Sequence, residues 1–100
     1  MSDDLTKILA NHTRRMLDLS TAHISKATCD AACARSISWA NTAPTEFGFV
    51  CYVHDERPED TFDDLWAVLE FARLYGFDYV LFDADAPHLP ESSGLPSFDW

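Results

Sequence analysis

The stretch PEDTFDDLWAVLEFARLYGFDYVLFDAD, residues 58–85, decides the fold because it predicts one helix followed by one buried strand. Pro58 and the acids after it suit the first turn of the helix, and Gly76 favours a left-handed stop. The apolar residues between them recur at the spacing of one helical face: Phe62, Leu65, Trp66, Val68, Leu69 and Ala72. The run 79–82 is short, apolar and rich in strand formers, so we expect a strand that is buried on both faces.

Upstream of this stretch, helices and strands continue to alternate. Residues 3–17 predict a helix that Ser2 caps, and residues 16–24 predict a first strand. Residues 25–40 predict a second helix, and residues 47–53 predict a second strand. The order α-β-α-β-α-β favours right-handed crossovers between parallel strands. We therefore expect an α/β fold with a small three-stranded, largely parallel sheet and helices packed on it.

One hundred residues suit a single domain with one modest core, so we expect residues 1–100 to form one unit. Within this unit, residues 1–17 form the N-terminal helix and residues 86–100 form a proline-containing tail. Phe98 and Trp100 are too apolar for a free tail. We expect the tail to dock on the domain, with an extra edge strand as one way of docking.

The three cysteines indicate a reducing compartment. Cys29 and Cys33 are one helical turn apart, and Cys51 lies in a predicted strand, unlike the even framework of a secreted domain. We expect all three to be reduced core residues. The sequence has no N-terminal signal pattern and no run near 20 apolar residues. These features predict a soluble cytoplasmic protein.

The net charge of −10 is large for this length and is unevenly distributed. Residues 1–40 carry five bases and four acids, whereas residues 41–100 carry 13 acids against only Arg57 and Arg73. A field of this sign repels nucleic acids and anionic membranes, and it attracts basic surfaces. We therefore expect no direct nucleic-acid binding, no membrane association and a basic protein or complex as the partner.

Three pairs of adjacent acids stand four residues apart between residues 55 and 64. Wherever this segment is helical, each pair lies about 6 Å beyond the last. A row of negative charges at such intervals can take the place of nucleic-acid phosphates in a groove lined by lysine and arginine. Together with two acids that follow the last strand, the candidate partner-binding residues are Asp55, Glu56, Glu59, Asp60, Asp63, Asp64, Asp83 and Asp85. The alternative is an acidic face that only solvates the protein.

A parallel sheet would also gather polar residues at the edge where its strands end, which is where open α/β sheets bind ligands. These residues are His23, His54, Asp55, Asp83, Asp85 and His88. Such side chains bind divalent metals, so a small metal-dependent hydrolase or ligand-binding domain is an alternative function. No pair among them has a recognised ligand spacing, and we expect no metal and no cofactor.

Motifs of other enzyme classes are incomplete. The strand that ends in Asp83-Ala84-Asp85 resembles the first motif of haloacid-dehalogenase-type phosphohydrolases, in which the two aspartates are nucleophile and acid/base. Catalysis in that family also needs a later lysine, and none occurs among the 15 residues that follow. No serine lies in a Gly-x-Ser-x-Gly elbow, and three glycines leave no room for a glycine-rich phosphate loop. We therefore expect a protein that is not an enzyme.

Three segments together resemble a known group of proteins. They are LSTAHIS at residues 19–25, YVLFD at residues 79–83 and GLPSFDW at residues 94–100. As a set they resemble a family of small acidic proteins of bacterial plasmids, prophages and integrative islands, and the resemblance covers most of residues 17–100. That family has no established activity. The resemblance implies a setting in which small acidic proteins often inhibit host defence, as anti-CRISPR and anti-restriction proteins do by DNA mimicry.

Charge and resemblance together predict a non-catalytic inhibitor that blocks a basic nucleic-acid-binding surface of a defence complex in the bacterial host. An antitoxin that neutralises a basic toxin requires the same electrostatics and stays open as a further alternative. The identity of the target and the oligomeric state are not predicted.

Overall fold

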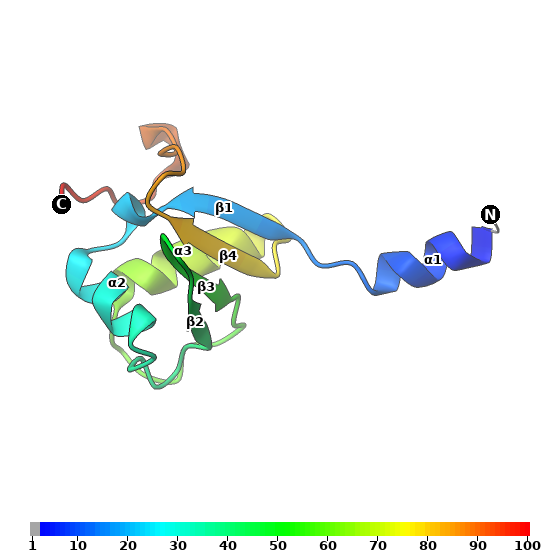
Figure 1. Ribbon diagram of the computed structural model, residues 1–100, viewed down its shortest axis with the longest axis horizontal. Helices are drawn as coiled ribbons and strands as arrows, with labels where there is room; N and C mark the ends of the chain where they lie inside the picture. The colour runs from blue at the N-terminus through cyan, green and yellow to red at the C-terminus, as the bar shows by residue number, and fades with distance from the viewer. Residues whose placement is uncertain (1–2) are drawn as a thin grey trace.

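The computed structural model describes residues 3–100 as a sheet with two helices packed on it and a third helix that stands apart (Figure 1). The helices are α1 (Asp3–Asn11), α2 (Lys26–Cys33) and α3 (Asp63–Leu74). The strands are β1 (Met16–Ser20), β2 (Thr42–Pro44), β3 (Gly48–Tyr52) and β4 (Tyr79–Asp83), and two short 3-10 helices are η1 (Thr21–His23) and η2 (Glu91–Ser93). The predicted cap Ser2 lies outside the described residues.

The predicted α/β class is confirmed, but the predicted sheet is wrong in strand number and direction. Four strands form one mixed sheet in the order β1-β4-β3-β2, in which only β1 and β4 are parallel. The strand β2, within the turn expected before β3, pairs with β3 through a short connection, which favours an antiparallel hairpin. Antiparallel pairing of β3 and β4 places Tyr52 opposite Tyr79 and Gly48 opposite Asp83.

The segment 53–62 explains why β3 and β4 are antiparallel. A helix that began at Pro58 would have returned the chain for a parallel strand, but these residues are irregular and α3 begins at Asp63. They run back along the sheet, so that α3 delivers the chain to the end at which β3 stopped. Phe62 precedes α3 with a φ of 57° and packs against the core, which delays the helix start. Gly76 has a φ of 81°, as the left-handed stop predicts.

Several other element bounds also differ from the predictions. Helix α1 ends at Asn11, and α2 ends at Cys33 because Arg35 adopts a φ of 57° and turns the chain. Strand β1 ends at Ser20, whose hydroxyl accepts a hydrogen bond from the backbone of Ala22 and thereby starts η1. No helix among residues 3–100 is long and apolar enough to cross a membrane.

One face of the sheet carries the core, and α3 crosses behind it in Figure 1. Core side chains alternate along the strands and meet the apolar faces of α2 and α3: Leu19, Phe49, Cys51, Val80 and Phe82 from the sheet, and Cys29, Ala32, Leu65, Val68, Leu69 and Ala72 from the helices. The intervening strand residues point to the other face, where all but Ser20 stay partly or fully exposed. The predicted burial of both faces of the last strand is therefore wrong, because no helix of residues 3–100 covers the second face.

The tail packs beside η1 and forms no strand within the described residues. The backbone N–H of Phe98 donates to the carbonyl of Ala22 at 2.7 Å, and Nε1 of Trp100 donates to the carbonyl of Ile24 at 2.9 Å. These bonds hold the tail against the end of β1. The tail crosses the end of β1 and does not run along the outer edge of this strand, which pairs with no other described strand.

Candidate functional site

Most of the predicted row of acids lies on a loop. Because residues 53–62 are irregular, the helical spacing of about 6 Å does not apply to the acids between 55 and 60. Five exposed carboxylates gather at this loop and at the start of α3, and we call them the acidic loop: Asp55, Glu56, Glu59, Asp60 and Asp63.

Arg57 organises the acidic loop. Its guanidinium donates to Oδ1 of Asp60 at 2.6 Å and to Oδ1 of Asp63 at 2.7 Å. The arginine side chain is only 18% exposed, whereas the two carboxylates are 92% and 83% exposed. The guanidinium carbon lies 5.8 Å from the centre of the Trp66 ring, within cation–π range. The base therefore lies beneath the carboxylates and orients both toward solvent. Arg57 is the one base between residues 55 and 64, and this position was the sequence signal that it orients the neighbouring acids.

Asp64 is the member of the predicted row that points inward. Its Oδ2 accepts from the backbone N–H of Ser25 at 2.8 Å, and its Oδ1 accepts from the hydroxyl of Thr28 at 2.9 Å. Ser25 is in turn the cap of α2. Asp64 therefore joins the start of α3 to the start of α2, and both of its oxygens are engaged inside the domain. No local sequence signal indicates this bond, because its partners are 36 and 39 residues away.

The remaining acids of the acidic loop are lightly held. Oε1 of Glu59 accepts from the hydroxyl of Ser38 at 2.7 Å, between two exposed side chains. Asp55 and Glu56 are exposed, and neither carboxylate accepts a hydrogen bond from another residue in the range 3–100. Their charge is therefore available to an external cation.

Asp83 and Asp85 lie at the other end of the sheet from the acidic loop. Asp83, at the end of β4, is opposite Gly48, at the start of β3. The acidic loop follows the end of β3, where Tyr52 is opposite Tyr79 at the start of β4. These ends are separated by the length of β4, about 13 Å. Oδ1 of Asp83 accepts from the backbone N–H of Asp85 at 2.8 Å, which makes a local turn. The eight predicted contact residues therefore do not form one surface.

The predicted cluster of strand-end histidines and aspartates is also divided. Because β3 runs antiparallel to β4, His54 and Asp55 lie at the opposite end from Asp83, Asp85 and the remaining two histidines. Nε2 of His54 accepts a hydrogen bond from the backbone N–H of Asn41 at 3.0 Å. Burial lowers the pKa of His54, although the negative charge of Asp55 acts in the raising direction. No group of three metal-ligating side chains occurs within the described part of the chain.

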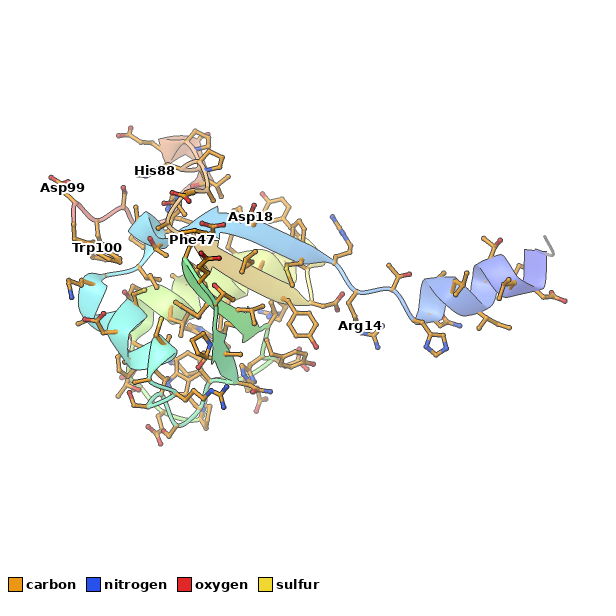
Figure 2. All side chains as sticks on the ribbon, viewed as in Figure 1. Arg14, Asp18, Phe47, His88, Asp99 and Trp100 are labelled. Carbon is orange, nitrogen blue, oxygen red and sulfur yellow. The ribbon has the colours of Figure 1, made fainter. Side chains whose placement is uncertain are left out.

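A pocket of about 360 Å³ lies where the parallel strands β1 and β4 end, and we call it the strand-end pocket. Its walls are Ser20, Thr21, Ala22, Ala84, His88, Phe98, Asp99 and Trp100, of which Figure 2 labels three. Thr21 is 7% exposed, and no buried side-chain nitrogen or oxygen of the described residues lacks a hydrogen-bond partner. Sequence reasoning placed His88 at this edge of the sheet, but it missed the walls that the tail supplies.

His23 connects the tail to the strand-end pocket. Its ring is 1% exposed, Nδ1 lies 2.8 Å from the carbonyl oxygen of Pro96, and Nε2 accepts from the backbone N–H of Leu89 at 3.0 Å. An acceptor at Nε2 requires the proton on Nδ1, which then donates to Pro96. Both nitrogens are thus occupied, and His23 is a structural residue of this edge.

Replacing His23 by Phe is expected to lower the free energy of unfolding by about 2 kcal/mol, because the ring is retained while two hydrogen bonds are lost. Urea denaturation of the whole chain measures the change. His88→Phe is the matched control, since that ring is exposed and lies 5.9 Å from His23. Equal midpoints for the two variants would show that the bonds of His23 do not hold the tail.

Residues 16–100 match a family of unknown function, the DUF5983 C-terminal domain. The chain belongs to this family. No curated protein and no solved structure matches the chain. The match begins at Met16, the first residue of β1, so that the acidic loop and the strand-end pocket both lie inside the DUF5983 domain, and α1 lies outside it.

Two of the three cysteines of the DUF5983 domain are buried in the core. All three are free, and Cys29 and Cys51 are buried, as predicted, whereas Cys33 is only partly buried. Burial raises the pKa of Cys51 to about 12, and burial together with Cys33 raises the pKa of Cys29 to about 11. Because the thiolate is the nucleophile and metal ligand, neither buried thiol supplies redox or metal chemistry near neutral pH.

Proposed function

We propose that this chain is a non-catalytic inhibitor from a bacterial mobile element that occupies a basic nucleic-acid-binding surface of a cytoplasmic defence complex. The observation that supports it is unbalanced charge. Residues 41–100 carry 13 acids and two bases, and the ion pairs of the described residues engage only Asp30, Asp60 and Asp63. No other carboxylate among the described side chains is paired with a lysine or arginine, and such a field steers a basic partner toward the domain.

The acidic loop is the proposed contact surface. It presents five carboxylates around a single guanidinium, and Arg57 fixes two of them before any partner arrives. Carboxylates that are already oriented lose less conformational freedom on binding. Asp64 takes no part in this contact because both of its oxygens are bound internally. Asp83 and Asp85 lie too far away to belong to the same contact and instead add to the general field.

The proposed setting follows from the resemblance carried by the segments at residues 19–25, 79–83 and 94–100. Small acidic proteins of plasmids and prophages often block host defence by imitating DNA, so an anti-CRISPR or anti-restriction target fits both charge and setting. An antitoxin that covers a basic toxin fits the same charge distribution. The two roles differ in the partner that is bound, and identification of the partner separates them.

The strand-end pocket favours a second candidate function, the binding of a small ligand. It lies at the carboxyl ends of two parallel strands, where open α/β sheets bind ligands, and its volume of about 360 Å³ is within the usual range of such sites. The hydroxyl of Thr21 and the side chains of His88 and Asp99 supply polar groups.

A capture experiment in bacterial lysate tests both candidates. The tagged chain is washed at about 0.1 M and then about 1 M salt, which shortens the Debye length from about 10 Å to about 3 Å. We expect a nucleic-acid-binding protein to be retained at low salt, released at high salt, and inhibited by the pure chain. A partner that resists high salt, or one that does not bind nucleic acid, would contradict the mimicry proposal. A small molecule that co-purifies in equal amount would instead favour the strand-end pocket.

A further inference from the structure

Helix α1 stands apart from the rest of the molecule. It extends beyond the DUF5983 domain, and the molecule is 49 Å long but only 29 Å and 26 Å across (Figure 1). Every described side chain of α1 is exposed, and Ile8 and Leu9 on its apolar face are 53% and 51% exposed. An amphipathic helix of nine residues is unstable in water unless its apolar face is buried. The helix therefore requires a docking surface.

The second face of the sheet is a surface of matching character, and we call it the open face. Its apolar residues come from all four strands: Met16, Ala43, Val50, Tyr52, Tyr79 and Leu81. Met16 and Tyr52 are 50% and 44% exposed, because α2 and α3 both pack on the opposite face. Uncovered sheet faces are normally polar, and a continuous apolar one marks an interaction site.

The connection between α1 and β1 is short and held straight. The backbone N–H of Arg15 donates to Oδ2 of Asp78 at 2.8 Å, and its Nη1 donates to the carbonyl of Tyr75 at 3.2 Å. The guanidinium carbon of Arg15 lies 4.4 Å from the centre of the Phe77 ring. Arg14 donates back to the carbonyl of Asn11 at 3.2 Å. Only residues 12–14 are left to turn the chain. Folding α1 onto its own sheet would require a reversal within these three residues and would break the bond from Arg14.

We propose that α1 of one copy docks on the open face of a second copy, and that the exchange is reciprocal. In this arrangement the connection between α1 and β1 keeps the hydrogen bonds of Arg14 and Arg15. A two-fold arrangement uses both helices and both open faces, which doubles the area buried by a single docking event.

Sedimentation velocity of the whole chain from about 5 to 500 µM tests the proposal. We expect a species of twice the chain mass of 11.3 kDa. Ile8→Lys combined with Leu9→Lys should raise the dimer dissociation constant at least 10-fold, because two apolar contacts per helix become charged. Ala10→Lys is the control, since Ala10 lies on the opposite side of α1 and a lysine there adds positive charge without altering the apolar face. Tyr52→Lys tests the open face in the same way, and circular dichroism verifies that each variant is folded.

The outcomes separate the possible occupants of the open face. A dimer that weakens in the Ile8/Leu9 and Tyr52 variants, but not in Ala10→Lys, supports the reciprocal exchange. A chain that stays monomeric at all concentrations overturns it and indicates that α1 folds onto its own sheet or binds another protein. A dimer that survives both variants also overturns it, because another surface must then hold the copies together. None of these results depends on the acidic loop or its partner.

Discussion

Reversing Asp55, Glu56 and Asp60 to lysine together is expected to weaken binding of the captured partner at least about 100-fold. Each reversal removes one attraction and adds one repulsion, and charge pairs at interfaces contribute about 1 kcal/mol or more each. Asp55 and Glu56 bind nothing inside the domain, and the carboxylate of Asp60 is 92% exposed, so the fold should survive. Dissociation constants measured at about 0.1 M and 0.5 M salt give the loss of affinity and show how much of that loss is electrostatic.

A control with the same change in net charge distinguishes local docking from general attraction. Glu46, Glu70 and Glu91 are exposed and lie outside the acidic loop, so their joint reversal to lysine changes the net charge by the same amount. We expect this control to slow association while leaving most of the affinity intact. Steering depends on the charge of the whole domain, whereas direct contacts depend only on the residues at the contact surface. If both triple variants lose affinity equally, the acidic loop is not the contact surface.

The substitution Gly48→Ala is expected to lower the free energy of unfolding by more than about 3 kcal/mol, enough to leave much of the protein unfolded. A Cβ at Gly48 would overlap the backbone carbonyl oxygen of Phe82 and lie 2.8 Å from its carbon. The backbone of Phe82 cannot retreat, because β4 is paired on both sides, with β1 and with β3. Urea denaturation gives the loss of stability.

Gly94→Ala is the matched control for this substitution. Gly94 has a φ of 78°, which strains an alanine by about 1 kcal/mol, but a Cβ there meets no atom within 4 Å. We therefore expect a smaller loss at Gly94 than at Gly48. A variant at Gly48 that is as stable as the one at Gly94 would mean that β3 and β4 are less closely paired than the structure shows.

The features predicted correctly from the sequence are those that depend on residues close together in the chain. The apolar spacing of α3 and the stop at Gly76 are confirmed, because both depend on residues within a few positions of one another. The same local rules placed the start of α3 too early. Pro58 suited a first turn, but Phe62 packs against the core with a φ of 57° and moves the start to Asp63. Burial of one distant contact thus outweighed a local preference.

The candidate site shows the same division. The excess of acids and their concentration in the second half of the chain are properties of the sequence alone. The direction in which each acid points is not, because it depends on partners that are distant in the chain. Asp63 and Asp64 are neighbours with identical side chains, yet one is held toward solvent by Arg57 and the other binds Ser25 and Thr28.

By itself, the sequence determined the α/β class, the negative field and the apolar faces of the individual elements, since these follow from composition and short-range periodicity. The tertiary structure decided the strand directions, and with them the separation of the acidic loop from Asp83. It also decided that the open face and α1 remain uncovered in a single chain. The physical reason is that pairing and burial join residues far apart in the sequence, and the path of the irregular segment 53–62 sets which residues meet.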